Sequence, residues 1–166
     1  MDAFLLIRQF LPKARLLIAG QSNSLSPHYL DCLRQRYASR LENVEFLGYV
    51  PDRELPRLFW DANIVTVTNS SNPGSSAVLR YAAAFGRGIV LPIVGLFESV
   101  HLEGWGVQHY RPRDTQDLAR TLLEILSDPE KQSGLARANY EMALHSKDSF
   151  VAAHLHAFRN LSMIAT

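Results

Sequence analysis

Residues 63–91, NIVTVTNSSNPGSSAVLRYAAAFGRGIVL, contain the pattern that decides the fold class. A short apolar run at residues 63–68 is followed by a small polar segment and then by a run of strong helix formers from Ala77 onward. A second apolar run follows at residues 88–91. Strand, loop, helix and strand in this order are typical of the unit from which parallel sheets are built.

The same alternation extends along the rest of the chain. Apolar runs predict five strands, at residues 15–19, 44–47, 63–68, 88–91 and 106–110. We therefore expect the α/β class, a Rossmann-like parallel sheet of about five strands with helices on both faces.

Start signals and apolar periodicity locate the helices. Ser26 is predicted to cap a helix that has Pro27 at its first position, and Asp52 a short helix that reaches Trp60. Asp114 is predicted to begin a helix whose apolar stripe includes Leu118 and Ile125. Two further helices are predicted at about 129–145 and 149–163.

Length and composition set the class of protein. With 166 residues, 47% of them hydrophobic, the chain can bury one sizeable core, so we predict a single domain over residues 1–166. The net charge of +1 provides no overall attraction to nucleic acid. Cys32 is the only cysteine, which excludes an internal disulfide. The apolar runs are shorter than the ~20 residues of a transmembrane helix. The first residues lack the basic region of a signal peptide, so a cytoplasmic location is expected.

Metal-binding patterns are weak in this sequence. His154 and His156 lie two positions apart on a predicted helix, where they point to different faces, so we predict no metal site there. Arg111 and Arg113 follow a predicted strand and are candidates for binding a phosphate. Pro112 and Asp114, however, make this segment typical of an ordinary turn from strand to helix.

Ligands of open α/β sheets bind beyond the carboxyl ends of the strands. The loops at these ends begin after Gly20, Gly48, Thr68 and Leu91, and the loop at residues 69–76 is the most polar. It leads into a predicted helix whose first N–H groups, together with the Ser75 and Ser76 hydroxyls, form a plausible phosphate site. The alternative, that Ser75 only caps the helix, is equally compatible with the sequence.

Five segments in order resemble the C-terminal, donor-binding domain of family 4-like glycosyltransferases of GT-B fold. They are residues 16–20, 44–50, 54–62, 74–86 and 106–113, and together with the helix after them they cover nearly the whole chain. The resemblance implies a nucleotide-diphosphate sugar as donor substrate. It also implies transfer with retention, no cofactor and no metal held by the protein.

The resemblance also implies where the donor binds. Gly48 and Val50 are expected near the base, and Gly20 lies at the neighbouring strand end. The diphosphate is expected near three residues of the polar loop, Gly74, Ser75 and Ser76.

Two glutamates that hold the donor in the family correspond here to Pro73 and Tyr81. Asn72 and Tyr81 are the residues that remain to replace them, through an amide and through a phenol. No catalytic residue is predicted.

The resemblance has consequences for partners. The N-terminal, acceptor-binding domain of these glycosyltransferases has no counterpart in residues 1–166. We therefore expect this chain alone to be inactive and to need a partner chain or a second copy. A cytoplasmic location, peripheral to the inner face of the membrane, fits this expectation. Two alternatives stay open: a non-catalytic interaction module with residues 77–85 and 150–161 at its interface, and one half of a sugar-nucleotide epimerase-like fold.

Overall fold

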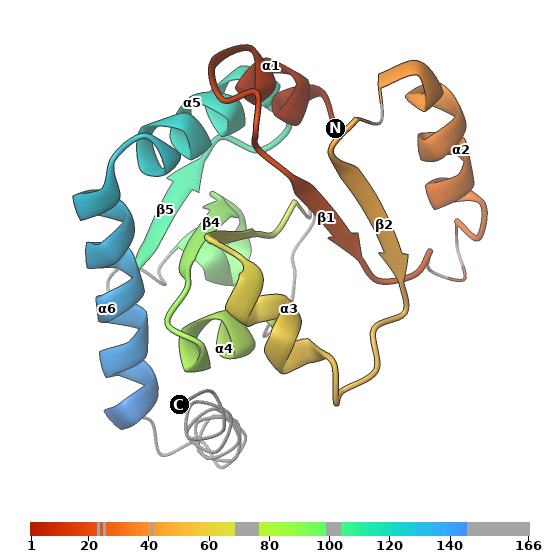
Figure 1. The fold of residues 1–166 in the computed structure, drawn as a ribbon. Helices are drawn as coiled ribbons and strands as arrows, with labels where there is room; N and C mark the ends of the chain where they lie inside the picture. The colour runs from red at the N-terminus through yellow and green to blue at the C-terminus, as the bar shows by residue number, and fades with distance from the viewer. Residues whose placement is uncertain (23, 25, 41, 69–76, 99–103, 146–166) are drawn as a thin grey trace. The chain divides into compact units, whose positions relative to one another are not determined.

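The computed structural model describes residues 1–22, 24, 26–40, 42–68, 77–98 and 104–145, and Figure 1 shows their helices and strands. The α/β class is confirmed, and all the strand pairs are parallel. The elements in chain order are α1 (Asp2–Phe10), β1 (Leu16–Ala19), α2 (Tyr29–Arg36), η1 (Ala38–Arg40), β2 (Val44–Gly48), α3 (Leu55–Asp61), β3 (Ile64–Thr66), α4 (Ala77–Ala84), β4 (Gly88–Pro92), η2 (Gly95–Glu98), β5 (Val107–Tyr110), α5 (Thr115–Leu126) and α6 (Pro129–His145).

The chain divides into two compact units, Met1–Leu55 and Pro56–Thr166. The first contains the two-stranded sheet β1-β2, and the second contains the three-stranded sheet β3-β4-β5. The predicted strands are thus all present, but hydrogen bonds join them in two sheets. That residues 1–166 form one domain stays a prediction.

In the first unit, β1 and β2 lie side by side with Leu16 opposite Val44. The Tyr37 hydroxyl donates to an Asp2 carboxylate oxygen at 2.5 Å and so connects the end of α2 to the start of α1. The same contact raises the pKa of the Tyr37 phenol, because the hydrogen bond to the Asp2 carboxylate stabilises the protonated hydroxyl.

The predicted start of the second helix was wrong. Helix α2 begins at Tyr29, three residues after Ser26, because residues 26–28 form a turn in which the Ser26 carbonyl accepts from the Tyr29 N–H at 3.1 Å. The Ser22 hydroxyl instead accepts from the Leu30 N–H, also at 3.1 Å.

In the second unit, β4 is the central strand and all five of its residues are buried. Val90 packs with Tyr110 of β5 and Ile125 of α5 in a fully buried cluster. Helix α5 packs against β5, and α6 packs against α4 and β4. The contact between α5 and β5 follows from the apolar stripe that the sequence predicts on α5.

The start of α5 was predicted correctly, whereas the helix expected from Asp52 begins only at Leu55, after a turn at residues 52–54. The Asp114 side chain caps α5 by accepting from the Asp117 N–H at 2.9 Å. Gly86 has a φ of +58° and ends α4 in a Schellman motif, in which its N–H donates to the Ala83 carbonyl and the Arg87 N–H donates to the Ala82 carbonyl. The helix predicted at 149–163 lies outside the described residues.

The side chain of Asn139 connects α6 to two strands. Its Oδ1 accepts from the Gly106 N–H at 2.8 Å, and its Nδ2 donates to the carbonyl oxygens of Arg87 at 2.6 Å and of Gly106 at 2.8 Å. Asn139 is fully buried, and these bonds satisfy its own amide as well as backbone groups of the two strands.

Gly106 lets α6 approach the sheet at this point. A Cβ atom on Gly106 would lie 1.9 Å from the Leu135 carbonyl oxygen, a distance that no side chain tolerates. Helix α6 and the start of β5 therefore meet through main-chain atoms.

We predict that Asn139→Asp destabilises the chain by about 3 kcal/mol or more, because a carboxylate oxygen would then face two carbonyl oxygens in a buried place. Urea unfolding measures the loss. The same change at exposed Asn63 is the control and should cost less than about 0.5 kcal/mol. Equal effects of the two variants would contradict this account of Asn139.

Candidate functional site

Two glycines lie next to each other at the carboxyl edge of β1-β2. The Gly20 N–H donates to the Gly48 carbonyl at 2.8 Å, and the two residues have φ values of +116° and +65°. An added Cβ would meet no atom within 4 Å at either position, so the backbone conformation, rather than lack of space, favours glycine here. The main chain at this edge is thus open to close approach by a flat ligand.

The residues after Gly48 extend this edge. Tyr49 is 66% exposed, and Val50 is half-buried. Gly20, Gly48 and Val50, all expected at a nucleotide site, therefore belong to one unit, and the hydrogen bond between the glycines brings two of them together.

The carboxyl edge of β3-β4-β5 is the second place where a ligand was expected. Four of the predicted residues, Asn72, Gly74, Ser75 and Ser76, lie outside the described residues, as does Pro73. The described part of the chain resumes at Ala77, the first residue of α4.

Tyr81 is described, and its ring belongs to an aromatic stack between α3 and α4. The Tyr81 ring lies 5.5 Å from the Phe59 ring at an angle of 12°, and the Phe85 ring lies 6.0 Å from Phe59 at 8°. Tyr81 is half-buried and Phe59 is buried. The phenol predicted to substitute for a ribose-binding carboxylate thus has a packing role.

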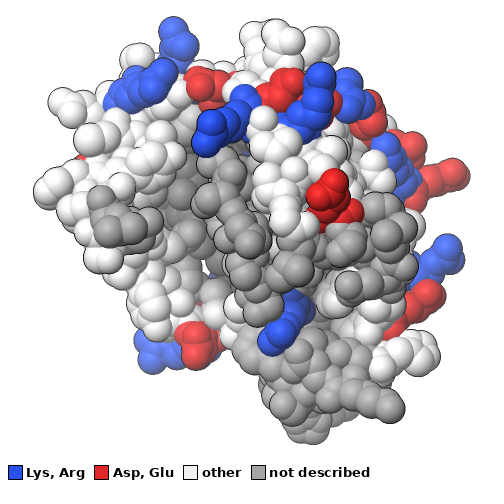
Figure 2. All heavy atoms as spheres, turned by 180° about the vertical axis from the view of Figure 1, so that it is seen from behind, with Lys and Arg blue, Asp and Glu red and all other residues white. Residues whose placement is uncertain are grey.

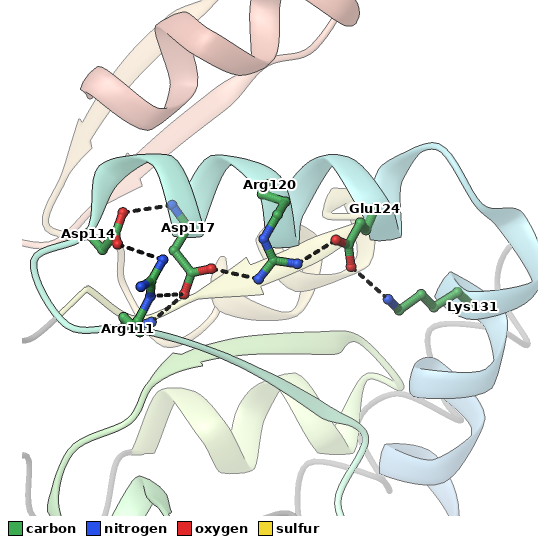
Figure 3. A network of polar contacts seen from close by, with 6 residues as sticks. All are labelled: Arg111, Asp114, Asp117, Arg120, Glu124 and Lys131. Carbon is green, nitrogen blue, oxygen red and sulfur yellow. Dashed lines mark hydrogen bonds and ion pairs between the residues drawn. The ribbon is translucent and has the colours of Figure 1, made fainter.

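A chain of ion pairs follows the carboxyl end of β5, as Figure 3 shows. Asp117 accepts from the Arg111 N–H at 2.7 Å and from an Arg120 guanidinium nitrogen at 2.6 Å. Arg120 also pairs with Glu124, which a Lys131 ammonium contacts at 3.2 Å. The network therefore connects the turn after β5 to α5 and α6.

Asp117 is the buried member of this network, with 8% of its side chain exposed. The backbone hydrogen bond from Arg111, followed by the one from the Arg120 side chain, lowers the pKa of the Asp117 carboxyl. Arg111 is held by Asp114 at 3.1 Å and by Asp117 at 3.5 Å, which agrees with the predicted turn from strand to helix. The sequence analysis missed Asp117, although its spacing from Asp114 and Arg120 was a usable signal.

In the described part of the chain, neither the charged side chains nor the potential metal ligands form a further candidate binding site. Figure 2 shows basic and acidic side chains interspersed on one face. His109 uses its Nε2 to contact the Phe97 carbonyl oxygen at 2.6 Å. Among the described residues, no group of three or more His, Cys, Asp or Glu side chains could hold a metal ion, and no helix is long and apolar enough to cross a membrane.

The family model of the glycosyl transferases group 1 matches residues 1–128, and the chain belongs to this family. No curated protein matches the chain. The arrangement of strands and helices is that of the C-terminal domain of GT-B glycosyltransferases.

Three solved structures illustrate the shared fold. The C-terminal domain of LpcC, a glycosyl transferase group 1 family protein from Francisella tularensis, is 16% identical with a TM-score of 0.77, and the match covers 89% of this chain and 77% of that domain. Sucrose-phosphate synthase from Thermosynechococcus elongatus is 22% identical with a TM-score of 0.72, over 99% of this chain and 42% of the synthase. HepE from Anabaena, in complex with UDP, is 19% identical with a TM-score of 0.74, over 96% of this chain and 44% of HepE. The chain thus spans less than half of the synthase and of HepE.

We predict that Asp117→Asn lowers the free energy of unfolding at pH 7 by about 1.5–3 kcal/mol, the range for hydrogen bonds to charged groups. Because the folded-state pKa of Asp117 lies below its unfolded value, its stabilisation is present above the unfolded pKa of about 3.9 and is lost as pH falls through the folded value. Below about pH 5 the variant should therefore lose less stability than the wild type. Urea unfolding from pH 7 to pH 3 measures both effects. Asp52→Asn, at an exposed carboxylate, is the control, and an unchanged acid response in Asp117→Asn would contradict the assignment.

Proposed function

We propose that this chain is the donor-binding part of a group 1 glycosyltransferase, which binds a nucleotide-diphosphate sugar and transfers its glycosyl group with retention. The family match over residues 1–128 is the observation that carries the proposal. HepE, which shares the fold, has been solved with UDP and with UDP-glucose, so uridine nucleotides are the first ligands to test.

The geometry of the first unit supports a place for the base. Gly20 and Gly48 expose main chain at one strand edge, and Val50 lies two residues further on. We place the base at this edge because unhindered backbone groups can hydrogen-bond to a flat ring without a side chain between them.

The diphosphate is proposed to bind near Gly74, Ser75 and Ser76. These residues come directly before α4 in the sequence, and the first N–H groups of a helix, together with its dipole, favour an anion. Asn72 is the nearest amide before them.

The whole reaction requires more than this chain. A chain that spans 42% of the synthase and 44% of HepE is proposed to act with an acceptor-binding domain, supplied by the rest of a longer protein, by a partner chain or by a second copy. Closing a cleft around the substrates excludes water and aligns the reacting groups. We propose no cofactor, no metal held by the protein, and a cytoplasmic location peripheral to the membrane.

A non-catalytic interaction module is the second candidate. It is favoured by the scarcity of carboxylates, since Asp61 is the only acidic residue between Leu55 and Phe97. The stacking of Tyr81 on Phe59 favours it too, because the side chain at an expected donor position packs against a neighbouring helix.

We expect one of UDP, GDP, UDP-glucose and GDP-mannose to bind the purified chain. At a ligand concentration of a hundred times Kd, binding adds roughly 2.7 kcal/mol of stability, which raises Tm by about 5–10 °C. Titration calorimetry and thermal unfolding measure both quantities. No binding of any of the four at millimolar concentration would contradict the proposal.

The proposed diphosphate position has a matched test. Ser75→Asp places a negative charge where phosphate is expected, so it should weaken binding of the same nucleotide by at least about tenfold, or 1.4 kcal/mol. Ser133→Asp makes the same change on an exposed turn of α6 and should leave Kd unchanged. Equal Kd values for the two variants would move the diphosphate elsewhere.

Tyr81→Glu distinguishes the two candidate functions. It should lower stability by about 0.5–1.5 kcal/mol through loss of the aromatic stack. If the chain binds a nucleotide sugar, a new carboxylate at this position should strengthen or preserve that binding, as calorimetry can measure. Tyr29→Glu, at an exposed tyrosine, controls for the added charge. Lower stability in Tyr81→Glu, with no nucleotide binding gained, would favour the interaction module.

A further inference from the structure

Pro92 removes one hydrogen-bond donor from the ladder between β3 and β4. The Val67 N–H donates to the Val90 carbonyl at 3.1 Å. In a parallel pair, the Val67 carbonyl would then accept from the N–H of the residue two positions after Val90. That residue is Pro92, which has no N–H. The Val67 carbonyl, just after β3, thus lacks its backbone donor from β4, and Val67 is buried.

Tyr110 supplies a donor at this point. Its hydroxyl lies 3.3 Å from the Val67 carbonyl oxygen and donates to it across the central strand β4. The ring packs with Val90 and Ile125 in the core, and only 4% of the residue is exposed. Burial raises the pKa of the Tyr110 phenol, which favours the protonated hydroxyl that donates this bond.

The position of Val67 gives this bond a functional meaning. Val67 is the first residue after β3, and Thr68 after it leads into the polar segment 69–76 in which three candidate diphosphate-binding residues lie. A carbonyl fixed at the end of β3 fixes the direction in which the chain leaves the strand, since each peptide unit is planar.

We propose that Tyr110 is a positioning residue for the nucleotide site: its hydroxyl replaces the backbone donor missing at Pro92 and so holds the end of β3 in the conformation that donor binding requires. The proposal rests on the proposed function. It assigns Tyr110 no contact with the ligand.

The first test compares two variants that each lose one side-chain hydrogen bond from this sheet. Tyr110→Phe keeps the ring and removes the bond to the Val67 carbonyl. Thr66→Val keeps the shape and removes the bond from the Thr66 hydroxyl to the Val90 carbonyl, 3.2 Å long, which the Val67 N–H still satisfies. Each should lower Tm by about 2–4 °C. Only Tyr110→Phe should raise the Kd for UDP, by about three- to tenfold. An unchanged Kd in Tyr110→Phe would overturn the proposal.

The second test restores the missing backbone donor. Pro92→Ala provides an N–H at the position where the ladder needs one, so Tyr110→Phe should have little effect on the Kd for UDP in the Pro92→Ala background. If Tyr110→Phe weakens UDP binding equally in both backgrounds, the hydroxyl does not act by replacing the donor at Pro92, and the proposal fails.

Amide hydrogen exchange separates this proposal from the proposed function. If the wild-type chain binds none of UDP, GDP, UDP-glucose and GDP-mannose, the proposed function fails and the nucleotide role of Tyr110 fails with it. In a chain that binds, exchange at Val67 and Thr68 should be faster in Tyr110→Phe than in Thr66→Val, and slower again in the double variant with Pro92→Ala. Unchanged exchange in Tyr110→Phe would show that nucleotide binding depends on Tyr110 by some other route, and would also overturn the proposal.

Discussion

One buried amide, the side chain of Asn139, ties together the elements of the larger unit. A helix packed on a parallel sheet normally contacts it through apolar side chains, which fix the distance but tolerate sliding. Asn139 adds three directional bonds to the backbone of Arg87 and Gly106, the residues just before β4 and β5. Because the amide has both donors and an acceptor, it pairs with the Gly106 N–H and the Arg87 carbonyl, and it gives the Gly106 carbonyl a second donor beside the Ile89 N–H. The position of α6 along the sheet depends on this side chain. The position of α4, which packs against α6, depends on it as well.

The sequence predicts those parts of the fold that local physics controls. The continuous apolar run of β4 and the Asp114 cap of α5 both appear where the pattern places them. The start of α2 was predicted wrongly, because the turn at residues 26–28 takes the place of the first helical turn. Long-range polar contacts are beyond such reasoning: the partners of Asn139 lie 33 and 52 positions away, and no periodicity connects residues so far apart.

In the candidate site, too, local features could be predicted from the sequence and long-range contacts could not. The two positive-φ glycines at the ends of β1 and β2 could be predicted, because glycine after an apolar run marks a turn that other residues resist. The packing of Tyr81 on Phe59 could not, since the two rings come from different helices and only tertiary structure brings them together. A residue can thus occupy a position expected to bind a ligand and still be recruited for packing.

The contact between Gly106 and Leu135 has a mechanical consequence. A Cβ at Gly106 would lie 1.9 Å from the Leu135 carbonyl oxygen, so helix and strand touch there without any layer of side chains between them. Side-chain layers contain the small voids whose elimination makes hydrostatic pressure favour unfolding. The contact between the Gly106 and Leu135 main chains contains no such void, and it contains no side chain that could change rotamer. Under pressure, this main-chain contact is therefore the least compressible part of the unit, and the interfaces packed through side chains compress before it.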